Sequence, residues 1–408
     1  MRGCARFVPE VRRRGPAAPG SPLRLYDAPA VGSVGRAVYI SIHLSPQSRG
    51  DAEDSETIEE LVDHSLAADA AGVAAICLTE HHTAGFNTYC DPFLMGAYLA
   101  PQLTQAYIAV HVVQVPFHSP VRIAEQANLL DLLTRGRCMV ALAPGSSRQI
   151  ELDVFGVDFA DRPGITRERI EALRRIWAWQ AGDEPLDVST ANDRGILSGR
   201  ISPSSFRKPH PLVGRATMTD ATIVESALLG WPAILALRSE GDDNRRQLAL
   251  YRSTLEGAGH DEATVRECLS WLGLTTLVSI APTEREARRQ HDEYLEIGGA
   301  GPIVRTAGEG SRAWAEEWRT RQLQRAEWSI VGTPEMVAES LLGDREIGAE
   351  HARVSFVTTP GRREQNLEAL QLFLGETLPL LDPQQLPGPA RTVETEAAAA
   401  LAAGSLPA

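Results

Sequence analysis

The sequence lacks an excess of basic charge. Its 40 lysines and arginines are outnumbered by 53 aspartates and glutamates, which gives a formal net charge of −13. Nucleic acids and anionic membrane surfaces both favour basic patches, so this balance argues against either as a partner. Basic residues are dense only near the N-terminus, among proline and glycine, where we expect a solvated tail.

The sequence also lacks long apolar runs and closely spaced cysteines. No apolar stretch reaches the ~18 residues of a transmembrane helix, and no uninterrupted apolar segment follows the N-terminal arginines as in a secretory signal. The five cysteines are odd in number and scattered, which is typical of unpaired thiols in a reducing compartment. We therefore expect a cytoplasmic protein.

Large apolar residues are scarce at both ends of the chain. Residues 1–35 and 383–408 contain proline, glycine and alanine but few large side chains to bury, so we expect a disordered leader and a disordered tail. The intervening residues 36–382 are numerous enough for one large domain or two ordinary ones.

Within residues 36–382, short apolar runs rich in β-branched residues alternate with longer segments of helical spacing. The runs expected to be strands are Val38–Leu44, Val73–Leu78, Ile108–Val115, Cys138–Ala143, Leu212–Thr217, Ala233–Leu237, Leu272–Ile280 and His351–Val357. Eight such units predict an α/β fold, a (β/α)8 TIM barrel with insertions. The alternative is an open doubly wound sheet, but no G-x-G-x-x-G follows the first strand.

Two segments interrupt this alternation. Residues 183–211 are polar with little apolar pattern, and they are long for a plain loop, so we expect a hairpin or flap. Residues 298–328 begin with glycines and continue with charged residues and tryptophans, which makes them a candidate lid over the active site.

The active site of such a barrel lies at the carboxyl ends of its strands, where histidines gather in this sequence. The second strand ends in Glu80, His81 and His82, and the third carries His111 and leads to His118. Imidazoles placed there can act as acid, base or hydrogen-bond donor near neutral pH. Glu80, His81 and His111 are also suitable metal ligands, although the H-x-H spacing that directs two ligands from one strand is missing.

The end of the fifth strand offers a different kind of site. Thr219 and Asp220 precede a helix, and hydroxyls with free backbone N–H groups at a helix N-terminus suit a phosphate. Arg167 and Arg169, in the first turn of the helix expected over 166–179, are possible partners for that phosphate. An ordinary N-cap and solvated surface arginines explain the same residues.

Five segments taken together resemble the bacterial luciferase-like flavin monooxygenase family in their order and spacing, from about residue 38 to 380. The segments are Leu78-Thr79-Glu80-His81-His82, Ser119-Pro120-Val121-Arg122-Ile123-Ala124-Glu125, Asn128-Leu129-Leu130-Asp131 with Arg135-Gly136-Arg137, Val154-Phe155-Gly156-Val157-Asp158, and Val331-Gly332-Thr333-Pro334-Glu335-Met336-Val337.

This resemblance implies roles for particular residues. His81 falls where the family keeps a catalytic histidine, flanked by Glu80 and His82, which match the motif. The residues that fall at flavin-binding positions are Thr219, Thr222 and Arg167 for the FMN phosphate and His111–Val112 for a non-prolyl cis peptide under the flavin ring. The family's glycine- and arginine-containing end of strand four is replaced by Ala143-Pro144-Gly145, which leaves Arg148 as a further candidate for the phosphate.

The resemblance also implies the reaction and its partners. Reduced FMN would react with O₂ and, through a peroxyflavin, transfer oxygen to a small organic substrate, while His81 exchanges a proton with the peroxide or substrate oxygen. A separate flavin reductase would supply the reduced FMN, because the sequence has no dinucleotide fingerprint. A homodimer is expected too, and the apolar residues that suggest its face are Phe93, Leu94, Tyr98, Leu129 and Leu132.

Three other functions remain open at this stage. A deazaflavin-dependent hydride-transfer oxidoreductase would use the same fold. A metal-dependent hydrolase would use the histidine cluster. A non-catalytic barrel subunit would have the fold without an active site, although retention of His81 argues against that alternative.

Overall fold

The computed structural model describes the central part of the chain. The described residues are 37–48, 50–83, 87–145, 149–180, 182–217, 219–239, 241–297, 320, 323, 326–357 and 361–387. The expected leader, most of the expected lid over 298–328 and residues 388–408 of the expected tail lie outside this set.

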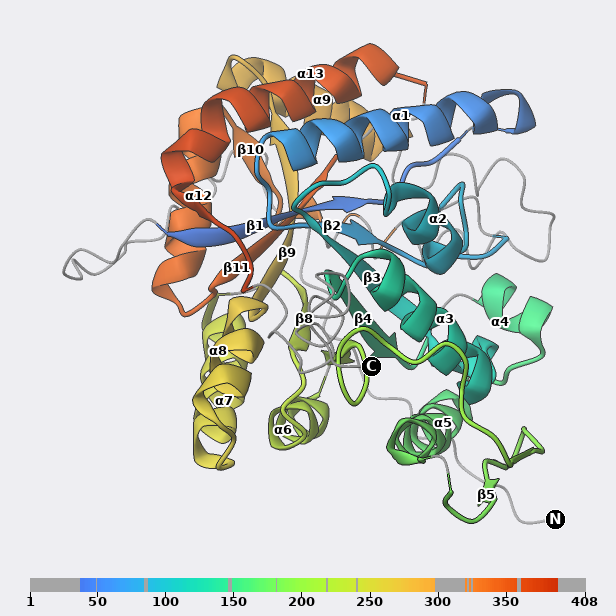
Figure 1. Ribbon diagram of the computed structural model, residues 1–408. Coiled ribbons are helices and arrows are strands. Elements are labelled where there is room, and N and C mark those ends of the chain that lie inside the picture. The colour runs from blue at the N-terminus through green and yellow to red at the C-terminus, as the bar shows by residue number, and fades with distance from the viewer. Residues whose placement is uncertain are drawn as a thin grey trace, which may run out of the picture. The chain divides into compact units, whose positions relative to one another are not determined.

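Eight parallel strands close into a barrel, as predicted (Figure 1). Around the ring, each strand pairs with the next, and the last, β11, pairs with β1. In ring order the strands are β1 (Val38–Leu44), β2 (Ala75–Leu78), β3 (Tyr107–Gln114), β4 (Cys138–Ala143), β7 (Leu212–Thr217), β8 (Ala233–Leu237), β9 (Gly273–Ile280) and β11 (His351–Phe356). Since all eight run the same way, their carboxyl ends meet at one rim.

Helices follow the strands and cover the outside of the barrel (Figure 1). They are α1 (Asp51–Ala70), α2 (Pro92–Leu99), α3 (Pro120–Leu133), α4 (Gln149–Phe155), α5 (Arg162–Ala178), α6 (Asp220–Leu228), α7 (Gly241–Gly257), α8 (Glu262–Ser270), α9 (Glu284–Ile297), α12 (Pro334–Glu346) and α13 (Arg363–Leu372). No described helix is both long and apolar enough to cross a bilayer.

The sequence pattern did not predict α4, α8 or the short strand β10 (Ile330–Gly332), which pairs with β9 beside the barrel. Each has nine residues or fewer, so its apolar period repeats too few times to be recognised. The chain also stays folded past residue 383, where the tail was expected to begin. Pro383–Gln384 (β12) pair with β1, and Leu386 is buried.

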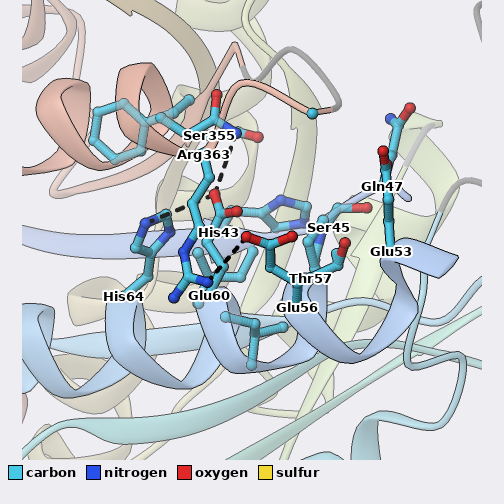
Figure 2. Close-up of a pocket in the computed structure, with 16 residues that line it drawn as sticks. His43, Ser45, Gln47, Glu53, Glu56, Thr57, Glu60, His64, Ser355 and Arg363 are labelled. Atoms are coloured by element: carbon cyan, nitrogen blue, oxygen red, sulfur yellow. Dashed lines mark hydrogen bonds and ion pairs between the residues drawn. The ribbon is translucent and has the colours of Figure 1, made fainter. Parts of the chain in front are cut away.

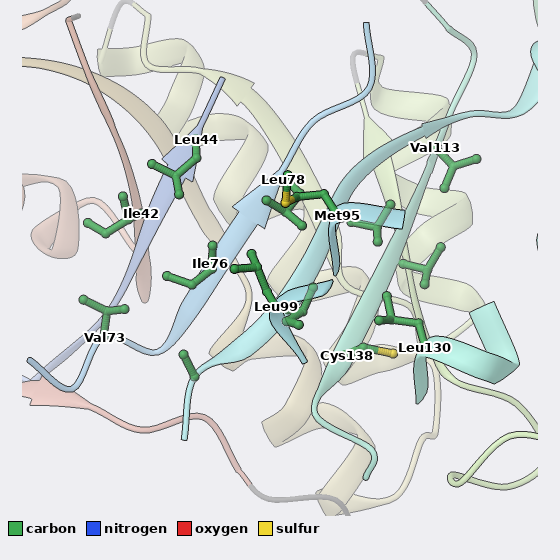
Figure 3. Packing of buried hydrophobic residues seen from close by; sticks show 14 of the residues in the cluster. Ile42, Leu44, Val73, Ile76, Leu78, Met95, Leu99, Val113, Leu130 and Cys138 are labelled. Atoms are coloured by element: carbon green, nitrogen blue, oxygen red, sulfur yellow. The ribbon is translucent and has the colours of Figure 1, made fainter. Parts of the chain in front are cut away.

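Alternate side chains on each strand face opposite sides of the barrel wall. The outward set packs against the helices (Figure 3), as Ile76 and Leu78 of β2 do with Leu99 of α2. The inward set is mostly small, and its members on β2, β3 and β4 include Ala75, Cys77, Ala109, Met139 and Ala141. Small inward side chains leave room within the barrel for larger polar groups from other strands.

The predicted flap is a hairpin of two short antiparallel strands, β5 (Leu186–Asp187) and β6 (Ile196–Leu197). Arg169 of α5 fastens it, because its guanidinium contacts both oxygens of Asp193 at 2.8 and 3.1 Å and donates to the carbonyls of Val115 and Pro116. Of the two readings of Arg169, phosphate partner or salt-bridged arginine, the structure shows the second, since its donors hold the hairpin.

Candidate active site

The loop after β2 carries the Glu80-His81-His82 sequence and is fixed by a tyrosine. The Tyr89 hydroxyl accepts from the backbone N–H of Thr79 at 2.6 Å and donates to the carbonyl of Leu44 at 2.9 Å. The side chain of Asn87 donates to the carbonyl of Thr79 at 2.8 Å. These bonds join the ends of β1 and β2 and set the direction in which Glu80 leaves the barrel wall.

Glu80 is the centre of a buried hydrogen-bond network at this rim. Its side chain is 1% exposed, and its Oε1 lies 2.7 Å from the Nε2 atoms of both His82 and His118. Its Oε2 accepts from the backbone N–H of Gln114 at 2.7 Å. One carboxylate therefore links the ends of β2 and β3, which the sequence predicted to lie side by side.

The charges within this network support each other. Burial raises the pKa of Glu80, but the hydrogen bonds from His118 and His82 outweigh it, and the net pKa is lowered. Burial likewise lowers the pKa of His118. The hydrogen bond to Glu80 and the negative charge of Glu80 raise it by more, so the net pKa is raised. The contact between the two side chains therefore favours the carboxylate form of Glu80 and the protonated form of His118.

His81 turns to a second buried carboxylate, which the sequence analysis missed. Its Nδ1 lies 3.3 Å from Oε1 of Glu151, a residue of α4 whose side chain is fully buried. Gln114 connects the two acids, because its Nε2 donates to the carbonyl of Glu80 at 2.8 Å and to Oε2 of Glu151 at 3.1 Å. The available signal was an acid between apolar Ile150 and Leu152, just beyond the end of strand four.

Three further imidazoles lie on the barrel strands. His111 of β3 is buried, both of its ring nitrogens lack a hydrogen-bond partner, and its ring meets that of His43 edge-on at 5.4 Å. Burial lowers the pKa of His43 to about 4 and that of His111 well below its usual value. The peptide bond between His111 and Val112 is cis, as the resemblance implied. The third imidazole, that of His351, lies deeper in the barrel.

The metal site considered from the sequence does not form. His81 pairs with Glu151 and His111 packs on His43, so Glu80, His81 and His111 do not converge. Within the described part of the chain, only Glu80, His82 and His118 bring three possible ligand atoms within 4.8 Å of one another. In that group the carboxylate oxygen is already hydrogen-bonded to both imidazoles.

The predicted phosphate site lies at the same rim, because β7 leads directly into α6. Thr219 is the N-cap of α6 and forms a capping box with Thr222, each side chain bonding the other's backbone N–H at 3.3 Å. Thr219 is exposed, and Asp220 in the first turn is paired with Arg246 at 2.8 Å. The hydroxyls are thus present at the N-terminus of a helix, as predicted, but they are bonded to one another.

The two remaining predicted cofactor residues differ in position. Arg167 lies on the exposed face of α5, two residues before the buried Arg169. Arg148 lies outside the described residues. Of the departures at the end of strand four, Pro144 and Gly145 are partly exposed, and the carbonyl of Gly145 accepts from Arg162 at 2.9 Å.

Comparison with known proteins gives a consistent result. A sequence model described as luciferase-like monooxygenase matches residues 38–351. The alkanal monooxygenase alpha chain of the Kryptophanaron alfredi symbiont is 23% identical over 348 residues, which cover 81% of this chain and 94% of that protein. The family match therefore runs from the start of β1 to the first residue of β11.

Solved structures share the fold. The oxygenating constituent of 3,6-diketocamphane monooxygenase from a Pseudomonas putida plasmid, in complex with FMN, has a TM-score of 0.63 and 16% identity, covering 84% of this chain and 98% of that chain. An F420-dependent secondary alcohol dehydrogenase, in complex with an F420–acetone adduct, has a TM-score of 0.63 and 14% identity, covering 85% and 99%. Such distant likeness shows the barrel alone and does not choose between the two cofactors.

Proposed function

Because the chain belongs to the luciferase-like monooxygenase family, we propose that it is a flavin-dependent monooxygenase that uses reduced FMN and O₂ to oxidise a small organic substrate. The observation that supports this most strongly is the rim, where the buried carboxylates of Glu80 and Glu151 hold three imidazoles. Four described cysteines are free, which suits action in the cytoplasm.

The residues at the rim fit a flavin. The ring nitrogens of His111 are buried without partners beside the mouth, and a heterocycle with hydrogen-bonding edges would satisfy them. The phosphate would lie at the N-terminus of α6, on the hydroxyls of Thr219 and Thr222, with Arg167 and Arg148 as candidate cations. When bound, reduced FMN supplies the electrons that activate O₂.

The chain's own part is to orient the substrate and move a proton. With Nδ1 of His81 directed at Glu151, the proton exchanged with the substrate oxygen is carried at Nε2. Glu151 holds the ring in that orientation, and Gln114 transmits the position of Glu80 to Glu151. His82 and His118 keep Glu80 charged and in place.

Stopped-flow mixing of the protein, reduced FMN and air-saturated buffer tests the proposal. We expect the protein to change the time course of flavin absorbance, and His81→Ala to slow oxygen transfer to added substrates strongly while leaving a measurable residual rate. His260→Ala is the matched control, because His260 bonds the carbonyl of Ala227 at the far end of α6. An absorbance course identical to that of free flavin would overturn the proposal, and turnover with reduced deazaflavin instead would assign the hydride-transfer alternative.

We also propose that a separate reductase supplies the flavin and that the chain forms a homodimer through α2 and α3. These helices pack together and expose Leu94, Tyr98, Leu129 and Leu132 at 71%, 58%, 48% and 38%. Phe93, expected in the same face, is buried and belongs to the core instead. Light scattering after size exclusion should give twice the mass of one chain, and Leu129→Lys should reduce the measured mass to that of one chain.

A further inference from the structure

A cavity of about 140 Å³ lies beside the rim, between the ends of β1 and β11 and the helices α1 and α13 (Figure 2). Its lining comes mostly from α1 and the residues after β1, and on the other side from Ser355, Phe356, Gly361, Arg363 and Asn366. The volume is below the ~300 Å³ at which small-molecule pockets begin, so it suits one end of a molecule.

The lining carries more negative than positive charge. Glu53, Glu56 and Glu60 lie on one face of α1, at spacings of three and four residues. The lining also contains Arg363, whose guanidinium nitrogens lie 3.3 Å from a carboxylate oxygen of Glu56 and 3.3 Å from one of Asp63. Its charge is shared between two carboxylates, so the cavity retains a net negative charge.

A buried imidazole in the cavity has no partner for its inner nitrogen. His64 is 7% exposed, its Nε2 forms no hydrogen bond, and this atom lies 3.8 Å from Oε1 of Glu60. Burial lowers the pKa of His64 to about 4, so the ring is neutral at pH 7. His64 and Glu60 therefore do not form an ion pair across the 3.8 Å between them. Oε1 of Glu60 accepts from Nδ2 of Asn366 at 3.2 Å, and a carboxylate oxygen can accept a second hydrogen bond. An N–H donor placed between Glu60 and His64 would use this capacity and would satisfy the imidazole nitrogen.

The cavity adjoins the candidate active site through one residue. His43 lines the cavity, and the centre of its ring lies 5.4 Å from that of His111 in the barrel. A molecule with one end in the cavity would therefore have its next atoms beside His43, toward the rim that carries His81.

We propose that this cavity binds the protonated amino group of the substrate, so that the substrate class is a small organic amine with at least one N–H. The proposal rests on the proposed function, because it assigns the cavity to the substrate of that reaction. Glu60 supplies the charge and one acceptor, and His64 supplies the second acceptor. A quaternary ammonium lacks the N–H donors that this pair requires, and a carboxylate is repelled by the three glutamates.

Calorimetric titration without flavin tests the cavity separately from the reaction. The probes are hexylammonium, hexyltrimethylammonium and 1-hexanol at pH 7, with the full chain. We expect hexylammonium to bind about tenfold or more tightly than the other two, since it alone can donate charge-assisted hydrogen bonds to Glu60. Calcium chloride in a further titration tests whether a divalent cation takes the same place and excludes the amine.

Two variants and one control locate the binding. Glu60→Gln should weaken hexylammonium about tenfold, and Arg363→Gln should strengthen it, because a competing cation is removed. Glu59→Gln is the control, since Glu59 is exposed on the same helix and does not line the cavity.

Equal affinity for hexylammonium and hexanol would overturn the proposal, as would equal losses in Glu60→Gln and Glu59→Gln, or calcium binding that displaces the amine. Amine binding without any effect of the protein on flavin oxidation would instead overturn the proposed function and leave the cavity as an amine site.

Discussion

Two groups of histidines near the barrel mouth differ in their partners. The rim histidines, His81, His82 and His118, each face a buried carboxylate. The barrel histidines, His43, His111 and His351, have no carboxylate partner in the part of the chain that the structure describes. His351 instead bonds Ser41 at 2.5 Å and the carbonyl of Ser270 at 2.9 Å, and it stacks on Trp271.

The difference shows that the partner, and not burial alone, decides which proton state a histidine favours. Burial acts on both groups, yet the pKa of His118 is raised by Glu80, whereas burial lowers the pKa of His351 to about 3. The nearby guanidinium of Arg353 strengthens the lowering in His43, His111 and His351. The barrel is therefore lined with imidazoles whose pKa is lowered, whereas at the rim the pKa of His118 is raised.

The largest effect is expected when the carboxylate of the rim is neutralised. Glu80→Gln leaves His118 without its counter-charge and should lower the free energy of unfolding by about 4 kcal/mol at pH 7, measured by urea denaturation. Because the pKa of Glu80 is lowered on folding, its contribution is present above the unfolded pKa and is lost as pH falls through the folded pKa. The control Glu59→Gln, at an exposed position, should change the free energy of unfolding by less than ~0.5 kcal/mol. If it lowers stability as much as Glu80→Gln does, the special role given to the buried carboxylate is wrong.

The barrel histidines should give a pH dependence of their own. A pKa of about 3 in the folded state means that the unfolded chain takes up a proton at His351 below about pH 6.5, while the folded chain does not. Acidification should therefore cost about 3 kcal/mol of stability by about pH 4. In His351→Gln, the free energy of unfolding should fall by about 3 kcal/mol less than in the unmodified protein between about pH 7.5 and 4. Identical pH profiles for the two proteins would contradict the lowered pKa of His351.

Glu151 should matter for catalysis through His81. Glu151→Gln is expected to lower kcat/KM by about 10- to 100-fold, the usual cost of losing a group that orients a catalytic residue. In the background of His81→Ala the same substitution should have no further effect, because the ring that it positions is gone. Additive losses in this double-mutant cycle would show that Glu151 acts otherwise, and circular dichroism checks that each variant is folded.

The smallest effect concerns the charge of His118. Its raised pKa means that its stabilisation is present below the unfolded value of about 6.5 and is lost as pH rises through the folded pKa. His118→Gln, which can still donate to Glu80, should cost about 1 kcal/mol near pH 5.5, and the cost should shrink toward about pH 8.5. Thermal melts at the two pH values measure it, and a cost that grows with pH would reverse the assigned sign.

The fold could be predicted from the sequence because its information is local. Each strand is a short apolar run and each long helix repeats its apolar spacing several times, so all eight barrel strands were found. The same reasoning could not separate Phe93 from Leu94, which are adjacent and apolar but point to the core and to solvent. Only the rotation of α2 against the barrel decides between them.

The site was predictable in its place but not in its pairings. The strand ends identified Glu80, His81 and His82, and the barrel brought His118 to them. The contact of His81 with Glu151 joins segments 70 residues apart, and no local pattern in either segment specifies it. The partner of Arg169 could not be named for the same reason, since Asp193 belongs to the flap.

His43 lines the cavity, and its ring also meets that of His111 in the barrel. A ligand in the cavity that reorients this imidazole would change what it presents to His111, so binding in the cavity and binding at the barrel mouth would be coupled. By thermodynamic linkage the coupling is reciprocal. The factor by which a ligand in the cavity changes affinity at the barrel mouth equals the factor by which a ligand at the mouth changes affinity in the cavity. Titrating each ligand with and without the other would then measure how strongly this side chain couples the two places.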